Sequence, residues 1–171
     1  MSHRISLKIA LGVLLLSCSN PAPVDSNADL YLASEELSSE NQAQMLPIGA
    51  EVIVGGEAIA LEVTRTPQQQ ALGLMYRKSL PANRGMLFSF DQPRYPRFWM
   101  KNVEISLDMI FLRDGEVKAI AANVPPCTTT PCPIYGPQTP IDQVIELRGG
   151  RASELGLKVG DRVTVEFLDA P

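Results

Sequence analysis

The chain has 171 residues with 15 basic and 19 acidic side chains, so its formal net charge at pH 7 is −4. This acidic balance argues against a nucleic acid as the partner. The sole histidine is His3, close to the N-terminus, so the rest of the chain lacks the residue on which most catalytic triads and most zinc or iron sites depend. We therefore expect no bound metal and no cofactor.

The N-terminus has the pattern of an export signal. Arg4 and Lys8 precede an apolar run at 9–16, which is far shorter than the roughly twenty residues that span a bilayer. Leu15-Leu16-Ser17-Cys18 also resembles a bacterial lipobox, which implies cleavage after residue 17 and lipidation of the Cys18 thiol. A lipid there would tether the protein to a membrane on its periplasmic or extracellular face. An ordinary secretory signal with an incidental cysteine is the alternative.

The segment after Cys18 is predicted to be a disordered acidic tether, which we place at 18–48. Residues 19–48 contain five acidic side chains and no lysine or arginine, together with many serines and asparagines. Such a composition buries too little apolar surface to offset the entropy lost on ordering. The remaining residues, 49–171, are predicted to form a single domain.

This domain reads as mainly β. Runs rich in β-branched and aromatic residues, separated by turn signals such as Gly55-Gly56 and Asp114-Gly115, predict strands. The predicted strands are 51–54, 58–64, 86–90, 97–101, 107–113, 116–124, 143–148 and 162–168.

Two short helices interrupt the strands. Thr66, Pro67 and Gln69 predict the start of the first, as N-cap, first helical residue and capping-box partner. The second is predicted at 151–155. About eight short strands with two small helices indicate a compact barrel or sandwich.

Two cysteines lie inside the domain. In an oxidising compartment, the pair Cys127 and Cys132 predicts a disulfide that closes a short loop. A redox-active dithiol is the alternative, but it needs a thiolate stabilised by a helix N-terminus or by cations, and the proline-rich surroundings do not obviously supply either.

Several motifs together resemble the bacterial and archaeal family called Domain of Unknown Function 192. They are Gly73-Leu74-Met75-Tyr76-Arg77, Gly85-Met86-Leu87-Phe88, Phe98-Trp99-Met100-Lys101-Asn102, Leu107-Asp108, Cys132-Pro133-Ile134-Tyr135 and Glu146-Leu147 with Gly149. The resemblance covers roughly residues 50–168 and implies a compact β-rich domain, often exported or lipidated, without an established biochemical function. Val103 departs from the pattern, because many members have a threonine there.

The motif around Trp99 suggests a binding surface. If 97–101 is extended, Arg97, Trp99 and Lys101 share one face, and Phe98 and Met100 share the core face. An indole between two cations can stack on a flat ligand such as a sugar ring. The alternative is that Trp99 itself belongs to the core.

Asp108 is predicted to be buried beside apolar residues and therefore needs a partner. Arg77, Lys101 and Asn102 are the expected partners, and Glu146 is expected to join the same cluster. The predicted ligand-binding residues are Arg77, Trp99, Lys101, Asn102, Asp108 and Glu146. The same cluster is alternatively an ion network that only stabilises the fold.

Two functions are compatible with these residues. The favoured one is a non-catalytic module in the cell envelope that binds a small polar or carbohydrate-like ligand or a protein segment. The alternative is a hydrolase of envelope glycans, with Asp108 and Glu146 as acid and base, whose carboxyl groups would lie roughly 5 to 9.5 Å apart across an open cleft. A structural or assembly factor is a third possibility and predicts an exposed apolar patch.

Overall fold

The computed structural model describes residues 42–168. The predicted export signal, the lipidated Cys18 and most of the predicted tether lie outside the described residues and stay predictions. Neither helix in the described part of the chain is long and apolar enough to cross a membrane.

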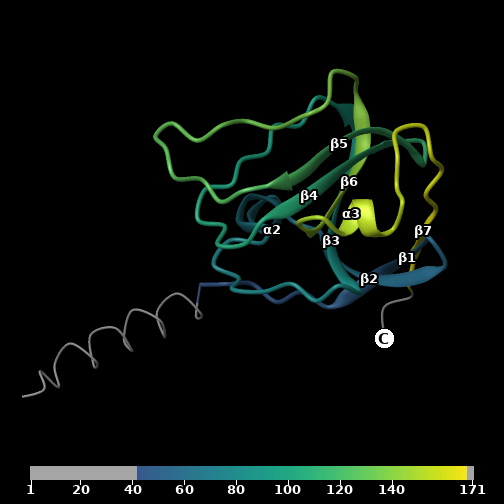
Figure 1. The fold of residues 1–171 in the computed structure, drawn as a ribbon, viewed down its shortest axis with the longest axis horizontal. Coiled ribbons are helices and arrows are strands. Elements are labelled where there is room, and N and C mark those ends of the chain that lie inside the picture. Colours follow the sequence, from purple (N-terminus) through teal and green to yellow (C-terminus); the bar gives the residue numbers. More distant parts are fainter. Residues whose placement is uncertain (1–41, 169–171) are drawn as a thin grey trace, which may run out of the picture.

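The described residues form one seven-stranded sheet in the order β5-β4-β6-β3-β2-β1-β7 (Figure 1). Every neighbouring pair is antiparallel except β2 and β3, which are parallel. The strands are β1 (Ile48–Val54), β2 (Glu57–Thr64), β3 (Arg84–Arg94), β4 (Leu107–Arg113), β5 (Glu116–Val124), β6 (Ile141–Arg148) and β7 (Val165–Phe167).

The turn signals in the sequence produce the two expected hairpins. Gly55 and Gly56 connect β1 to β2 with φ angles of 60° and 80°, and Asp114 and Gly115 connect β4 to β5 with φ angles of 51° and 74°. Positive φ at both central residues gives the turn a twist that matches the flanking strands.

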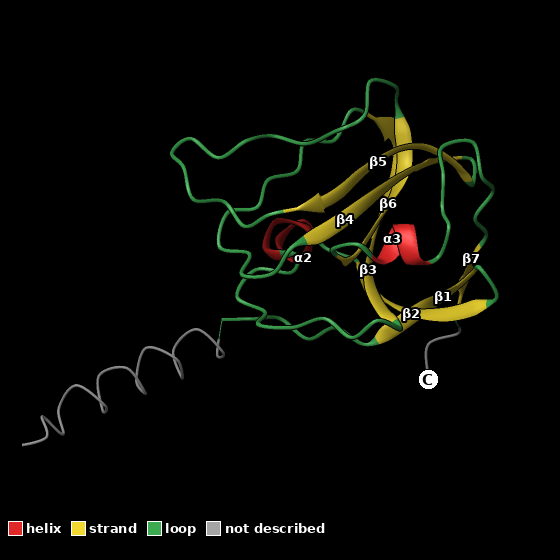
Figure 2. Cartoon of the chain, viewed as in Figure 1, coloured by secondary structure: helices red, strands yellow, loops and turns green. Residues whose placement is uncertain are grey.

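Two short helices lie apart from each other, as Figure 2 shows. Helix α2 (Pro67–Leu72) is part of the crossover between the parallel strands β2 and β3, and its predicted capping box is present between Thr66 and Gln69. Helix α3 (Arg151–Glu154) follows β6 and contacts β4 and β6. The predicted mainly β fold with two small helices is confirmed.

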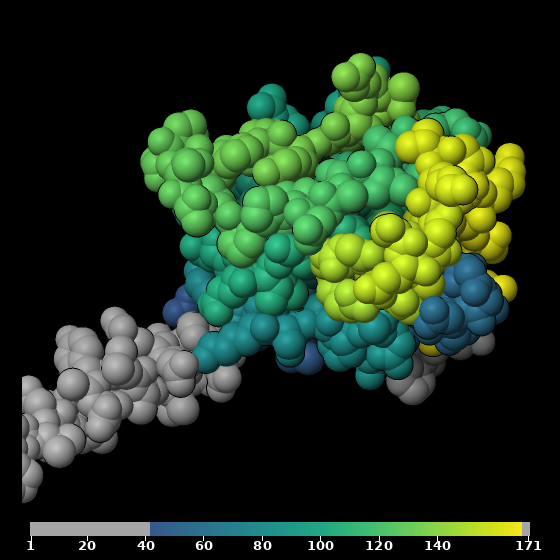
Figure 3. Space-filling view, viewed as in Figure 1, coloured from purple at the N-terminus to yellow at the C-terminus, as the bar shows by residue number. Residues whose placement is uncertain are grey.

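The central strands are buried on both faces because two hydrophobic cores lie on opposite sides of them. Alternate residues of β6 illustrate this, since Ile145 and Leu147 belong to one core and Val144 to the other. Figure 3 shows how the C-terminal segment, in yellow, lies beside the β1–β2 hairpin, in blue, on one side of the domain.

The sheet is sandwich-like and does not close into a barrel. Its edge strands β5 and β7 do not pair with each other, and an isolated bridge joins Glu116, at the start of β5, to Arg162 in the loop before β7. The predicted strand 162–168 shortens to β7, because Arg162 makes only this bridge.

The predicted strand 97–101 is wrong, since only Phe98 makes a β-bridge, with Tyr135. The reciprocal N–H···O bonds of these two residues are each 2.8 Å long. Tyr135 lies in the long loop between β5 and β6, where Cys127 and Cys132 form the predicted disulfide. The described residues provide no second neighbouring strand to complete a ladder here, and the segment ends in a turn at Lys101 and Asn102.

Residues shortly before 49 make contacts with the domain. The side chain of Gln44 donates to the carbonyl oxygens of Gln69 and Gly73, and the amide of Leu46 donates to Glu62. The end of the predicted tether is therefore attached to the domain.

Candidate functional site

A pocket of about 490 Å³ lies between α2, the end of β3 and the segment that follows β3. This volume falls in the range of small-molecule sites. Its walls are mostly apolar and aromatic, and its principal apolar lining residues are Leu74, Met75, Phe88, Phe90, Phe98, Trp99 and Val103. Phe88 and Phe98 meet edge to face with ring centroids 5.2 Å apart, which gives this wall a defined shape.

Glu146 of β6 is the acidic residue that lines the pocket. Glu146 is only 4% exposed. Its neighbours on the adjacent strands are Met86 of β3 and Met109 of β4, which are both fully buried. No other described side chain or backbone group forms a hydrogen bond or ion pair with its carboxyl group. Burial away from water raises the pKa of Glu146 from 4.5 to about 8, since the charged form loses its hydration.

At neutral pH the carboxyl group of Glu146 is therefore mostly protonated. A neutral carboxylic acid can donate one hydrogen bond and accept others, so it can anchor a polar atom of a ligand that enters an otherwise apolar space. A buried polar group without a protein partner is uncommon, because leaving it unsatisfied costs stability. Glu146 is thus the strongest indication that the pocket receives a ligand.

The polar lining residues besides Glu146 are Gln70, Arg94, Tyr95 and Arg97. The guanidinium group of Arg94 lies 3.7 Å from the centre of the Phe90 ring and donates to the side chain of Gln70. Both arginines are exposed, and within residues 42–168 neither forms an ion pair. The lining of the pocket therefore combines a buried acid with exposed cations.

Trp99 lies in the pocket wall and is 46% exposed. The ammonium group of Lys101 is 5.5 Å from its ring centre. Met100 is buried, and Phe98 packs against the core that contains Val144. Arg97, Trp99 and Lys101 are exposed. The predicted division of this segment into a core face and a charged aromatic face is confirmed, and the alternative of a core tryptophan is wrong.

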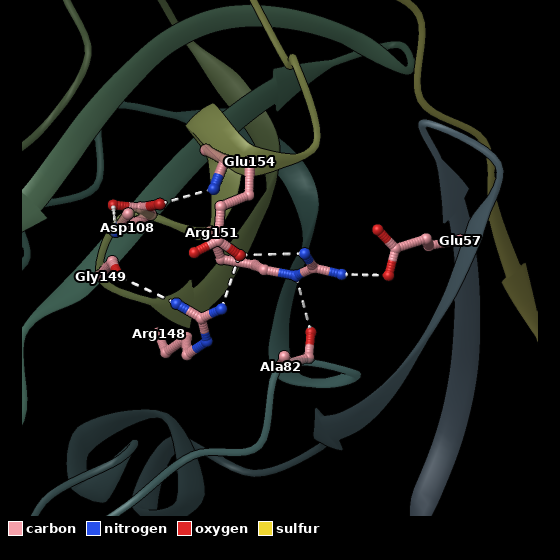
Figure 4. A network of polar contacts seen from close by, with 9 residues as sticks. Glu57, Ala82, Asp108, Arg148, Gly149, Arg151 and Glu154 are labelled. Atoms are coloured by element: carbon pink, nitrogen blue, oxygen red, sulfur yellow. Dashed lines mark hydrogen bonds and ion pairs between the residues drawn. The ribbon is translucent and has the colours of Figure 1, made fainter.

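Asp108 does not belong to this pocket. Its carboxylate accepts three hydrogen bonds from backbone amides, those of Asn123 at 2.6 Å, Gly150 at 2.9 Å and Ala152 at 2.7 Å. Figure 4 shows it beside the start of α3. The prediction that Arg77, Lys101 or Asn102 would pair with Asp108 is wrong, because backbone donors satisfy the carboxylate. Its observed contacts hold α3 and the end of β5 together.

Arg77 and Asn102 have other partners. Arg77 forms a bidentate ion pair with Glu62, with N···O distances of 2.7 and 2.6 Å, and it also donates to the carbonyl oxygen of Gln44. Asn102 donates to the hydroxyl oxygen of Tyr76 at 2.7 Å. Of the six predicted site residues, Trp99 and Glu146 line this pocket and Lys101 stands next to Trp99.

The arrangement does not suit the two-carboxylate hydrolase. Asp108 faces the core that contains Ile110 and Leu147, whereas Glu146 faces the opposite core with Val144. An acid and a base on opposite faces of a sheet cannot act on one bond. Residues 42–168 contain no cluster of three or more His, Cys, Asp or Glu side chains suited to a metal ion.

Two groups of pocket residues were missed from the sequence. Phe98 was assigned to the core and Phe88 was named only within a family motif, and Arg94 was not singled out. One signal could have indicated Arg94: residues 92–103 contain three basic residues, three aromatic residues and no acid. An uncompensated basic and aromatic stretch is typical of a binding surface.

The fold and the pocket together define a small β-rich domain whose pocket has aromatic walls and one buried carboxyl group. A sequence profile of the Domain of Unknown Function 192 family, described as "Uncharacterized ACR", matches residues 50–165. The chain belongs to this family, as its motifs predicted. Comparison with curated proteins gives no match.

Two crystal structures are similar to the chain. One is a protein of unknown function from Novosphingobium aromaticivorans, with 34% identity and a TM-score of 0.62, covering 74% of this chain and 96% of the other. The second, from Sinorhizobium meliloti, is described as a candidate transcription regulator, with 32% identity and a TM-score of 0.61, covering 68% of this chain and 91% of the other. Neither description names a ligand or a reaction.

Proposed function

We propose that this protein is a non-catalytic binding module whose pocket beside Trp99 and Glu146 holds a small ligand with a flat or apolar face and a polar atom. The observation that carries the proposal is the buried, unpartnered carboxyl group of Glu146 inside an aromatic pocket. Such a combination of apolar walls and one convergent polar group is typical of small-molecule sites.

The walls favour a ring-shaped ligand. Phe88, Phe98 and Trp99 offer aromatic surfaces on which a sugar or an aromatic ring can stack. A protein segment that inserts one side chain into the pocket would use the same contacts. A hydrolase is disfavoured because Glu146 has no second carboxyl group beside it, and an assembly role is disfavoured because it leaves Glu146 unexplained.

The cellular setting is part of the proposal. The lipobox at Leu15-Leu16-Ser17-Cys18 supports a lipid anchor on the outer face of a membrane, with the acidic segment after it as a flexible connection. We therefore propose that the module samples ligands in the cell envelope.

Fluorescence offers a direct test, because Trp99 is the sole tryptophan of the chain and lies in the pocket wall. A panel of sugars, aromatic metabolites and short peptides is titrated while the Trp99 emission is recorded. A true pocket ligand changes this emission and raises the melting temperature.

The pocket is then blocked by Val103→Phe, which adds bulk to a buried wall residue. Val159→Phe is the matched control, since Val159 is 63% exposed and lies outside the pocket. Binding lost in the first variant and retained in the second supports the proposal. A panel in which every hit binds Val103→Phe as well as the unmodified protein would rule it out.

A further inference from the structure

The charges in the pocket lining suggest which ligand it selects. Arg94 and Arg97 are exposed, and within the described part of the chain neither guanidinium group forms an ion pair. Exposed cations that protein acids do not neutralise attract anions and repel cations. A ligand in the pocket therefore meets two positive charges.

The buried end of the pocket has the opposite chemistry. Glu146 is flanked in the sheet by Met86 and Met109, and it forms no ion pair with any described residue. In its neutral form this group can donate a hydrogen bond to an oxygen atom of a ligand. Aromatic rings line the same pocket as Glu146 and the two arginines, so the body of the ligand is expected to be apolar.

The size of the pocket limits the ligand. A volume of about 490 Å³ accommodates a compound of one or two rings. The edge-to-face pair of Phe88 and Phe98 leaves a wall suited to a flat body.

We propose that the ligand is a small organic anion with a flat apolar body, whose acidic group meets Arg94 and Arg97 and whose far end accepts a hydrogen bond from Glu146. This inference rests on the proposed binding function and adds the ligand class. It disfavours a lysine or amine inserted toward Glu146, which the two arginines would repel.

Three probes with one ring scaffold separate the possibilities. They are 4-hydroxybenzoate, which is anionic, 4-hydroxybenzyl alcohol, which is neutral, and 4-hydroxybenzylamine, which is cationic. Each carries a distal hydroxyl group for Glu146. Binding to the full-length protein is measured by calorimetry and by Trp99 emission at pH 7, at low and at high salt.

The anion is expected to bind about fivefold or more tightly than the alcohol, since its charge can interact with the two exposed guanidinium groups. This preference should shrink at high salt. It should also vanish in Arg94→Gln/Arg97→Gln, which leaves the apolar walls intact. The control Arg65→Gln/Arg84→Gln removes two exposed arginines outside this pocket and should keep the preference.

The response to pH tests the position of Glu146. The polar groups that share the pocket with it are Gln70, Arg94, Tyr95 and Arg97, and its neighbours in the sheet are the two flanking methionines. Affinity for the anion should fall as the pH rises past about 8, where Glu146 loses its donor proton and becomes negative. Glu146→Gln keeps a donor and should remove this fall.

The outcomes separate the inference from the proposed function. If the alcohol binds as tightly as the benzoate and Val103→Phe abolishes both, the pocket is a binding site and the anion preference is overturned. Strongest binding by the amine overturns the inference in the same way. If none of the three probes binds, the ligand class is wrong, whereas the proposed function fails only when the wider panel gives no hit that Val103→Phe blocks.

Discussion

At the scale of single residues, Asp108 and Glu146 are both buried, but their carboxyl groups have different surroundings. Asp108 accepts three backbone hydrogen bonds at the start of α3, whereas Glu146 has none of its side-chain hydrogen bonds made by the described residues. A satisfied buried carboxylate stabilises a fold, and an unsatisfied one destabilises it. Replacing each carboxylate by its amide is therefore expected to change the stability of the fold in opposite directions.

Stability should decrease with rising pH because of Glu146. Its pKa is about 8 in the folded protein against 4.5 as the ordinary value, so between these values the folded state holds a proton that the unfolded state has released. The free energy of unfolding then falls by about 1.4 kcal/mol per pH unit from this group. Urea denaturation at pH 5, 6.5 and 8 should show Glu146→Gln gaining stability relative to the unmodified protein as pH rises.

Glu104→Gln is the control for that series, because Glu104 is exposed and its side chain is not required by any observed contact. It should leave the pH profile unchanged. Parallel profiles for Glu146→Gln and the unmodified protein would contradict a buried, protonated Glu146.

Asp108→Asn should lower the free energy of unfolding by roughly 2–4 kcal/mol. An asparagine can accept with only one of its two terminal atoms, so at least one buried amide that now donates to Asp108 loses a charge-assisted bond. Binding in the pocket should be retained at temperatures where the variant is folded. Unchanged stability combined with lost ligand binding would place Asp108 in the site instead.

At the scale of elements, the pocket depends on segments that are not strands. Phe98 is held by its bridge to Tyr135, and Tyr135 follows the disulfide-bonded Cys132 in the connection between β5 and β6. The Arg77–Glu62 pair holds the segment that enters β1. Arg151 at the start of α3 donates hydrogen bonds to Glu57, Ala82 and Glu154 (Figure 4).

Replacing both Cys127 and Cys132 by serine should lower the free energy of unfolding by about 2 kcal/mol. The bridge closes a loop with a sequence separation of 5, and loops this short give a modest entropic stabilisation. Denaturation with and without reductant measures the effect, and reductant should not affect the double-serine variant. An equally stable variant that has lost all ligand binding would instead indicate a functional thiol pair.

Arg77→Met should lower the free energy of unfolding by roughly 3–5 kcal/mol, because it leaves Glu62 buried with an uncompensated charge. The double variant Arg77→Met/Glu62→Gln should recover a large part of this loss. Hydrogen exchange at the Leu46 amide, which donates to Glu62, should become faster in the single variant. If the double variant is no more stable than the single one, the uncompensated charge is not the cause.

At the scale of the whole molecule, the domain and the N-terminal region have separate tasks in our proposal. The domain provides the pocket, and Cys18 provides attachment to a membrane. Lipidation of a cysteine adds a strong apolar anchor to an otherwise acidic chain.

Cys18→Ser should therefore move the protein from the membrane fraction to the aqueous fraction of cells, as fractionation and immunoblotting would show. The purified variant should bind the same ligands with the same affinity, because the pocket residues lie far along the chain from Cys18. Membrane association that survives the substitution would contradict a lipid anchor at this position.

Local rules account for what could be predicted. The hairpins at Gly55-Gly56 and Asp114-Gly115, the capping box at Thr66 and the alternation through Phe98 and Met100 each depend on neighbouring residues. The strand 97–101 failed as a prediction because a ladder needs partners, and only Tyr135 is available. Closure of the sheet into a barrel would likewise require the edge strands β5 and β7 to pair, and neighbouring residues alone do not determine this.

The sequence by itself determined the family, the β-rich class, the disulfide pair and the absence of histidine from all but the N-terminus. It also marked Trp99 and Glu146 as residues of interest. Only the tertiary structure decided that these two share a pocket with Arg94 while Asp108 faces the other side of the sheet. The physical reason is that motifs and turns are local, whereas the partner of a buried charge is chosen by strand order and by which face each side chain occupies.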